Sequence, residues 1–460
     1  MPSFFDRSSQ IARPGFSRWL VPPAALAIHL CIGQAYAFSV FNLPMTKLIG
    51  ITQSAPDDWK LTELGWIFSI AIAFLGISAA VFGRWVESGG PRRAMFVSAC
   101  CFAGGFLVSA LGVQLHNIWV VYMGYGVLGG IGLGIGYISP VSTLIKWFPD
   151  RPGMATGMAI MGFGGGAMIG SPLAVMLMKT YATPTSLGVA ETFVTMGVIY
   201  FIIMMFGVFT IRLPAEGWAP EGYVPRKTAG ALISVGNVDV DTAFKTRQFW
   251  LLWLVLCMNV TAGIGVLGQA SPMIPEMFPG HVTAVGAASF VGLLSIFNMA
   301  GRFIWSSASD YMGRRNTYVV FFVLGIILYA VVPTIGHIGK VELFIAAYAI
   351  ILSMYGGGFA TIPAYLRDVF GTMHVGAIHG RLLTAWSVAG VLGPVLVNYI
   401  REYQLAHGVA KADAYTFTMH LMAVLLAVGF FANWLMKPVD SRYHYRGAPS
   451  GRAADGLRRT

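Results

Sequence analysis

The sequence predicts an all-α integral membrane protein with twelve transmembrane helices in two pseudo-symmetric halves of six. Of its 460 residues, 56% are hydrophobic and 11% are charged, and the mean hydropathy is +0.69. This composition is typical of a chain that lies largely in lipid. Twelve apolar segments are each long enough to cross a bilayer as a helix. The polar stretch 214–246 divides them into two sets of six.

The apolar segments divide the chain into five parts. We expect a cytoplasmic amino-terminal segment at 1–18, a six-helix half at 19–213, a central cytoplasmic loop at 214–246, a second half at 247–438 and a basic cytoplasmic tail at 439–460. The central loop is rich in glycine, proline and charge, as linkers are. The expected membrane segments are 19–45, 62–86, 93–115, 117–145, 153–179, 192–213, 248–273, 282–308, 316–338, 341–366, 376–400 and 414–436.

The basic residues predict the orientation in the membrane. Loops on the cytoplasmic side are enriched in lysine and arginine. With the amino terminus inside, few basic residues face outward, and both termini are cytoplasmic. The net charge of +11 then follows from the inner loops and needs no nucleic-acid partner. We expect a multi-pass protein of the inner (plasma) membrane, whose outward-facing basic residues are Lys47, Lys60, Lys179, Lys340, Arg401 and Lys411.

The two halves repeat each other at an offset of 223 positions. Parallel repeats of six segments are typical of transporters that bind substrate between the halves, near the middle of the membrane. The offset is read from the matching of Glu87, Gly90, Arg92, Pro140, Gly153, Gly157 and Gly170 to Asp310, Gly313, Arg315, Pro363, Gly376, Gly380 and Gly393.

Arg302 is the first candidate for a binding residue. It lies eight residues before Asp310, about 12 Å along a helix, in an otherwise apolar segment. A charge at that depth costs at least about 2.5–3.5 kcal/mol. All 19 acidic residues fall at segment ends or in loops, so a visiting anion is the expected counter-charge. Backbone carbonyls or water remain the alternative.

Two further residues belong with this arginine. Asn298 lies one turn away on the same helix face and could donate from its amide. A helix–helix hydrogen bond is the alternative for it. Tyr137 lies nine residues before Lys146, again near the middle of the membrane. It follows the run GGIGLGIG, which favours close helix packing and lacks the context of a phosphate loop. For Tyr137 the alternative is core packing.

Several stretches of the chain resemble a known family. The loop motif of the major facilitator superfamily is matched by GRWVESGGPRR (83–93) and by SSASDYMGRR (306–315), in which Ser306 replaces the usual glycine. The oxalate:formate antiporter family, which is related to the monocarboxylate transporters, is resembled by KWFPDRPGMATG (146–157), NMAGRFIW (298–305) and YGGGFATIPAYLRDVFGTMHVGAIHGRLLTAWSVAGVLGP (355–394).

This resemblance implies the major facilitator fold, alternating access and small carboxylate substrates. Arg302 matches the arginine that binds the substrate carboxylate, and Tyr137 matches a tyrosine that contacts substrate. Two departures concern charge. Trp386 stands where the antiporter has a second cation, and Asn298 stands where animal monocarboxylate transporters have an aspartate. The walls of the cavity are expected to include Tyr355, Phe359 and Trp386, and helix packing is the alternative role for these aromatic residues.

Other residues are expected to serve gating and coupling. His379, near the cytoplasmic mouth, is a candidate proton-coupling group, with hydrogen bonding at a helix end as the alternative. His29 and His420 are interpreted as structural, and Tyr36 as part of an outer gate. The cytoplasmic gate motif comprises Gly83, Glu87, Gly90, Arg92, Asp310, Gly313 and Arg314.

The resulting hypothesis is a secondary transporter of lactate-, pyruvate- or formate-type anions by alternating access, proton-linked and functional as a monomer in the lipid bilayer. One alternative is an oxalate:formate type antiporter. An alternative from another class is a membrane sensor that binds a carboxylate. We expect no enzyme activity, no cofactor and no metal site, because the sequence has no nucleophile–base pattern, phosphate-cradling loop or metal-ligand spacing.

Overall fold

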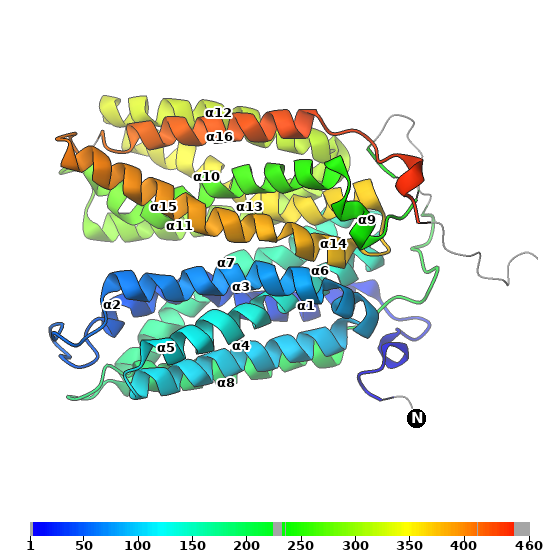
Figure 1. Cartoon of the computed structure of the whole chain (residues 1–460), viewed down its shortest axis with the longest axis horizontal. Coiled ribbons are helices and arrows are strands. Elements are labelled where there is room, and N and C mark those ends of the chain that lie inside the picture. The colour runs from blue at the N-terminus through cyan, green and yellow to red at the C-terminus, as the bar shows by residue number, and fades with distance from the viewer. Residues whose placement is uncertain (1–2, 224–231, 235, 412, 446–460) are drawn as a thin grey trace, which may run out of the picture.

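The computed structural model of the protein describes residues 3–223, 232–234, 236–411 and 413–445. It does not describe the side chains of 266, 268, 269, 271, 272, 284, 285 and 288. Part of the predicted central loop and the end of the predicted basic tail lie outside the described residues. Within them the chain is helical, and two helical bundles lie side by side (Figure 1).

The helices of the first bundle correspond to the first six predicted membrane segments. Several of these segments are built from more than one helical piece. The bounds are α1 Val21–Ile32, η3 Gly33–Phe41, α2 Asn42–Met45, α3 Leu61–Gly89, α4 Pro91–Gln114, α5 Ile118–Val121, η4 Tyr122–Gly129, α6 Gly130–Trp147, α7 Pro152–Tyr181 and α8 Val189–Thr210.

The second bundle follows a short helix in the central loop, α9, Val240–Phe244. Its helices are α10 Arg247–Met277, α11 Ala284–Met312, α12 Arg314–Ile338, α13 Val341–Phe370, α14 Val375–Leu382, α15 Thr384–Ala406 and α16 Thr416–Trp434.

The predicted fold class is confirmed. Among the described residues, eleven helical stretches are long and apolar enough to cross a membrane. The remaining predicted crossing is α11, which carries Arg302 and packs against α7 and α13. Some helices extend past the predicted segments, as α15 does to Ala406, because backbone hydrogen bonding continues beyond the apolar run.

Three of the membrane crossings change helix type or break close to candidate residues. The first passes from α1 into the tighter 3-10 turns of η3, which carry Tyr36. The fourth contains a π-helical stretch before α6, which carries Tyr137. The eleventh breaks at Leu383, between α14 with His379 and α15 with Trp386. Irregular helical turns are frequent at functional sites.

The interface between the bundles uses the same packing twice. On one side α3 packs against α14 and α15, and on the other α7 packs against α11. Glycines allow the close approach. A Cβ on Gly380 would lie 2.1 Å from the carbonyl oxygen of Ala79, and a Cβ on Gly157 would lie 3.0 Å from that of Arg302. The two pairs are equivalent in the repeat, because Arg302 follows Ala79 by 223 positions and Gly157 precedes Gly380 by the same number.

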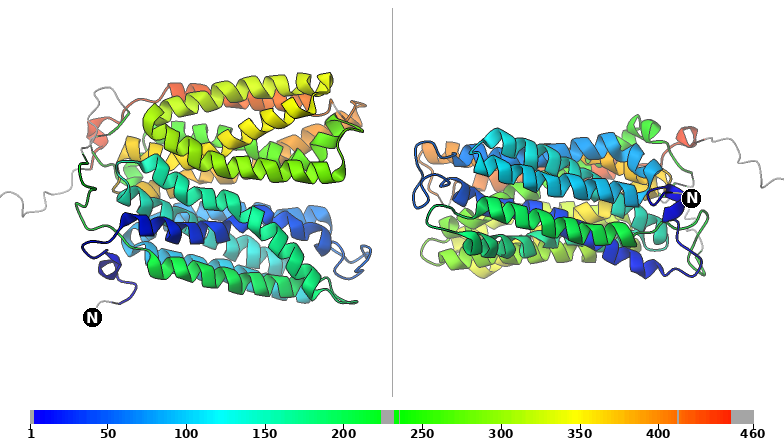
Figure 2. Two further views of the ribbon diagram at one scale, coloured as in Figure 1. Left: turned by 180° about the vertical axis from the view of Figure 1, so that it is seen from behind. Right: turned by 90° about the horizontal axis from the view of Figure 1, so that it is seen from below.

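The turns of the two loop motifs lie at one end of the molecule. Gly90 between α3 and α4 has a φ of +81°, and Gly313 between α11 and α12 has a φ of +84°, a backbone conformation that suits glycine. The amino terminus and α9 lie at this same end in both figures (Figures 1 and 2). We call it the inner end, because the basic residues predict that it faces the cytoplasm.

Candidate functional site

Arg302 lies fully buried on α11, between the two bundles. Its Nε donates to Oδ1 of Asn298 at 3.2 Å, and its Nη1 donates across the interface to the carbonyl oxygen of Ile160 on α7 at 3.4 Å. The Nη2 nitrogen has no hydrogen-bond partner in the part of the chain that the structure describes. No ion pair of the described residues includes Arg302. Asn298 therefore positions the guanidinium group, which keeps one edge open.

Aromatic rings enclose this guanidinium group. Its carbon lies 5.2 Å from the ring centroid of Phe359 on α13 and 5.7 Å from that of Phe163 on α7. The Trp386 ring packs on both, at 4.6 and 5.4 Å. Both halves thus contribute to one enclosure, the aromatic cage, which consists of Tyr36, Tyr137, Phe163, Tyr355, Phe359 and Trp386.

Two members of the aromatic cage carry open polar groups. The Tyr137 ring lies 5.4 Å from both Phe163 and Trp386. The hydroxyl of Tyr137 and Nε1 of Trp386 are buried and have no hydrogen-bond partner among the described residues. Together with the open Nη2 of Arg302, the site holds three donor groups. A carboxylate accepts such hydrogen bonds and supplies the charge that the arginine needs.

The cage is closed toward the outer end by two tyrosines. The hydroxyl groups of Tyr36 on η3 and Tyr355 on α13 lie 3.2 Å apart and join the two halves. Tyr36 also packs edge-on against Phe163, with centroids 5.1 Å apart. Tyr355 is therefore part of the wall and of an outer closure together with Tyr36.

Phe163 was absent from the residues predicted from the sequence. It lies in the run MGFGGG, in which a single aromatic suggests only helix packing. One signal was available. Phe163 and Trp386 occupy equivalent positions of the two repeats, so the predicted role of Trp386 pointed to its counterpart.

Both buried histidines lie next to Tyr137, on the inner side of the cage. His379 on α14 has its ring centroid 5.8 Å from that of Tyr137, and His29 on α1 has its centroid at 5.3 Å. Neither ring nitrogen of His379 has a hydrogen-bond partner among the described residues. The alternative role for His379, hydrogen bonding at a helix end, therefore finds no partner. His29, interpreted from the sequence as structural, lies beside the candidate site.

A carboxylate of the first half locks the inner end to the second half. Glu87, at the end of α3, accepts a hydrogen bond from Nζ of Lys146 at 2.6 Å. It also accepts one from the backbone N–H of Gly376 at 2.9 Å. That N–H belongs to the first turn of α14, where the helix dipole favours negative charge.

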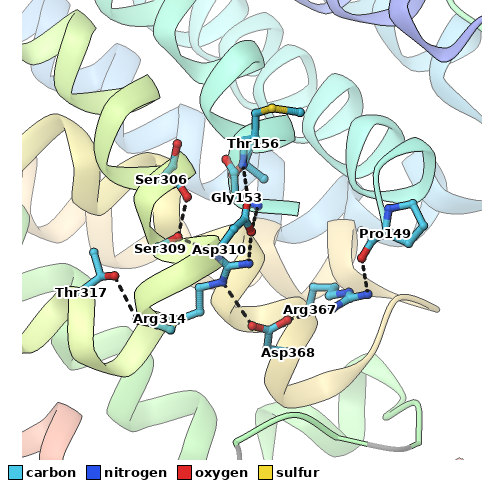
Figure 3. Close-up of polar contacts among 12 residues, drawn as sticks. Pro149, Gly153, Thr156, Ser306, Ser309, Asp310, Arg314, Thr317, Arg367 and Asp368 are labelled. Atoms are coloured by element: carbon cyan, nitrogen blue, oxygen red, sulfur yellow. Dashed lines mark hydrogen bonds and ion pairs between the residues drawn. The ribbon is translucent and has the colours of Figure 1, made fainter. Parts of the chain in front are cut away.

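The second half repeats this lock in the opposite direction (Figure 3). Asp310, at the end of α11, accepts hydrogen bonds from the backbone N–H groups of Gly153 and Met154, at 2.9 and 2.8 Å, in the first turn of α7. Arg314 pairs with Asp310 at 2.5 Å and with Asp368 at 3.2 Å. Two carboxylates in equivalent repeat positions therefore hold the halves together at the inner end.

The remaining residues of the gate motif have different positions. Gly83 lies at the interface, where a Cβ would approach the Cα of Ala377 to 2.8 Å. Among the described residues, Arg92 contacts the amino-terminal segment and not the carboxylates of Glu87 or Asp310. Its Nη1 donates to the carbonyl oxygen of Phe4 at 2.9 Å, and its backbone N–H donates to Oε1 of Gln10 at 3.0 Å. Arg92 thus anchors the amino-terminal segment to the start of α4.

The helix α9 of the central loop adds a third link between the halves. The carboxylate of Asp241 pairs with Arg84 of α3 at 2.5 Å and with Arg381 of α14 at 2.6 Å. The hydrogen bond from Arg381, together with that from Arg84, holds the pKa of Asp241 below its ordinary value. Because Arg381 is engaged by α9, it is not a second cation of the cage.

Comparisons with known proteins agree with this architecture. The family model described as Major Facilitator Superfamily matches residues 24–394. The oxalate:formate antiporter of Oxalobacter formigenes is 25% identical over 379 residues, which cover 82% of this chain and 83% of that protein. Apicoplast pyruvate carrier 1 of Toxoplasma gondii is 23% identical over 532 residues, covering 95% of this chain and 93% of that protein.

A solved structure shows the same fold. The proton:xylose symporter XylE, bound to 6-bromo-6-deoxy-D-glucose, has a TM-score of 0.69 at 14% identity, with 93% of this chain and 96% of that chain covered. The relatives are transporters and not enzymes. The chain belongs to the Major Facilitator Superfamily and is a multi-pass membrane transporter.

Proposed function

We propose that this protein is a secondary transporter of small monocarboxylates, linked to protons and working by alternating access in the plasma membrane, with both termini in the cytoplasm. The observation that carries the proposal is the open edge of Arg302. A buried guanidinium group without an acidic partner destabilises the empty protein. A carboxylate at Nη2, with the hydroxyl of Tyr137 and the indole of Trp386 as further donors, supplies the missing charge.

The composition of the cage favours a single negative charge. Phe163 and Phe359 cover the guanidinium group with apolar rings, and an indole occupies the place where the resembling antiporter has its second cation. A second carboxylate on the substrate would be buried against these rings without a partner, at a cost of several kcal/mol per ion. Monoanions of the lactate, pyruvate or formate type avoid that cost.

The contacts at the two ends support alternating access. The inner end is held by Glu87 and Asp310, whose hydrogen bonds involve charged groups and contribute about 1.5–3 kcal/mol each. The outer end of the cage is closed by the neutral contact of Tyr36 and Tyr355, worth about 0.5–1.5 kcal/mol. The outer closure therefore opens more readily from this state, and substrate enters from outside.

Proton linkage is proposed for two reasons. The described carboxylates lie toward helix ends and in loops, as Glu87 and Asp310 do, so none of them is placed in the middle of the membrane to carry a proton beside the cage. His379 beside Tyr137 is a titratable group within reach of the cage. A proton bound at His379 or on the substrate itself would make uptake respond to a proton gradient.

The test uses purified protein reconstituted into liposomes. Uptake of labelled lactate, pyruvate, formate and oxalate is measured with and without an inward proton gradient. Saturable uptake of monocarboxylates that the gradient stimulates supports the proposal. A protein that binds carboxylates but moves none is instead a sensor, and saturable uptake of other solutes alone would refute the carboxylate assignment.

An oxalate:formate type antiporter is the second candidate function. It is favoured by the 25% identity to the oxalate:formate antiporter of Oxalobacter formigenes. In that case substrate uptake would depend on an internal anion and would not respond to the proton gradient. Preloading the liposomes with formate, at equal internal and external pH, distinguishes the two candidates.

A further inference from the structure

Two buried histidines from opposite halves of the molecule contact the same tyrosine ring. The exposed fractions of the residues His29 and His379 are 0% and 1%. Both rings lie within 6 Å of Tyr137, at centroid distances of 5.3 and 5.8 Å. Each histidine lies seven residues, about 10 Å along a helix, to the inner side of a cage residue, Tyr36 or Trp386. The pair thus lies between the aromatic cage and the inner-end contacts of Glu87 and Asp310.

The ring nitrogens of this pair offer open proton acceptors. Nδ1 of His29 lies 3.2 Å from the carbonyl oxygen of Ala25. A carbonyl oxygen only accepts, so Nδ1 carries the hydrogen and Nε2 of the neutral ring keeps its lone pair. That Nε2 and both nitrogens of His379 have no hydrogen-bond partner among the described residues. Buried polar atoms are normally paired, so unpaired nitrogens call for a ligand.

The repeat shows that the scaffold does not need these imidazoles. The position equivalent to His379 is Thr156, whose hydroxyl donates across the interface to the carbonyl oxygen of Ala360 at 2.6 Å. The position equivalent to His29 is Leu252, a buried apolar residue. One half thus packs at this level with a threonine and the other with a leucine. Both histidines depart from the repeat, as Arg302 does.

The charged surroundings of the pair are positive. The charge of Arg302 acts on His29, and a charge on His29 would act on His379. The acidic residues described at the inner ends of α3, α9 and α13 are paired with basic side chains. Without a carboxylate partner, a charged imidazole is costly in this closed state, so both rings are neutral. The engaged carboxylates are Glu87 of α3 with Lys146, Asp241 of α9 with Arg84 and Arg381, and Asp368 of α13 with Arg314 and Arg367.

We propose, building on the carboxylate transport proposed above, that His29 and His379 together form the binding site for one transported proton. When a substrate carboxylate neutralises Arg302, a proton from the outer medium forms an N–H bond at a free ring lone pair. A second proton is excluded, because two neighbouring imidazolium groups repel each other. Substrate and proton therefore bind with positive coupling.

Release follows from the position of His379 next to the inner gate. His379 lies three residues after Gly376, whose N–H binds Glu87. When that contact breaks and the first turn of α14 separates from α3, inner water reaches His379. After the carboxylate has left, the bare charge of Arg302 destabilises the imidazolium, and its N–H bond breaks to water. One anion and one proton have then crossed, and the rings return neutral.

The test measures proton movement and substrate movement in the same liposomes. A trapped pH-sensitive dye reports acidification of the lumen when external lactate is added, and labelled lactate reports homoexchange at equal pH. Wild type is expected to acidify the lumen by one proton per substrate. His29→Gln and His379→Gln keep a hydrogen-bonding side chain without titration. Each is expected to lose coupled acidification and to retain homoexchange.

His420→Gln is the matched control, because His420 is an exposed histidine on α16, and it should behave as wild type. Size-exclusion profiles and thermal unfolding establish that each variant is folded, and His29→Asn and His379→Asn replace any that is not. Acidification that survives in either single variant overturns the proposal, as does joint loss of homoexchange and acidification. Wild-type exchange without proton movement overturns it but leaves carboxylate transport intact. A wild type that moves no carboxylate removes the proposed function itself.

Discussion

Replacing Arg302 with lysine tests the carboxylate clamp while retaining the charge. In the structure the guanidinium group uses Nε for Asn298 and Nη1 for the carbonyl oxygen of Ile160, and its Nη2, which has no partner among the described residues, is the proposed contact to the substrate. Lysine has a single nitrogen. If that nitrogen stays with the two protein oxygens, the substrate loses the planar fork that matches a carboxylate.

The expected loss can be estimated from that geometry. A hydrogen bond to a charged group contributes about 1.5–3 kcal/mol, and each 1.4 kcal/mol is about a factor of ten in affinity. Losing one such bond to the substrate in Arg302→Lys should raise the KM for a monocarboxylate by about 10- to 100-fold. The measurement is the concentration dependence of labelled lactate uptake into liposomes.

The matched control is Arg212→Lys. Arg212 donates to the carbonyl oxygens of Phe209 and Ile211 beyond the end of α8, far along the chain from the cage. This variant makes the same chemical change and should keep the wild-type KM. Wild-type KM and rate in Arg302→Lys would refute the clamp, because a point charge would then suffice.

Three further outcomes are expected. Unlabelled oxalate should compete with labelled lactate less well than pyruvate or formate does, because Arg302 is the cation that faces the cage; oxalate as the strongest competitor would contradict this. Glu87→Gln should speed deuterium exchange of the α14 amides by weakening the bond to Gly376, and unchanged exchange would remove Glu87 from the inner lock. The hydrogen bond from Arg381 lowers the pKa of Asp241. The ion pairs of Asp241 with Arg84 and Arg381 are therefore fully formed above the ordinary aspartate pKa of about 3.9, and they are lost as the pH falls through the lowered pKa. Asp241 is therefore ionised at both pH 8 and pH 5. The protection of the α14 amides at the inner end, which is the measured deuterium exchange corrected for the intrinsic exchange rate at each pH, should be the same at both, and Asp241→Asn should lower that protection at both.

The membrane helices could be predicted because apolar runs and loop charges are local properties of the chain. The places where helices end beyond those runs show the limit of that signal. The helix α15 continues past the apolar run through Arg401, whose charge is paired with Glu276 of α10. An apolar run marks the end of lipid contact, whereas the backbone helix ends where its hydrogen bonding ends.

The short helix α9 lies in a stretch expected from its composition to be a loop. Its five residues would not form a stable helix alone, because nucleation is unfavourable in so short a segment. Contacts with distant residues support it, above all the pairing of Asp241 with Arg84 and Arg381. These partners are far apart in the sequence, so a local sequence pattern cannot predict their contacts.

The residues of the site could be predicted only in part from the sequence. Arg302 was identifiable because a charge in an apolar segment is conspicuous by itself. Phe163 and His29 are not conspicuous, since one is an aromatic in a membrane helix and the other a lone histidine. Their relevance depends on the rings around them, which come from both halves. The position of Arg92 in the loop motif predicts a gating role, whereas its contacts with Phe4 and Gln10 depend on a segment far from it in the sequence.

The repeat separates what the scaffold needs from what the site needs. Ala79 and Arg302 occupy equivalent positions, and the backbone of each packs against an equivalent glycine, Gly380 or Gly157. A small apolar side chain therefore satisfies the packing in one half, and nothing in the fold requires an arginine in the other. The buried charge destabilises every closed state that lacks an anion. A carrier with this arrangement reorients most readily when a carboxylate occupies the cage, so exchange of substrate should be faster than the return of the empty protein.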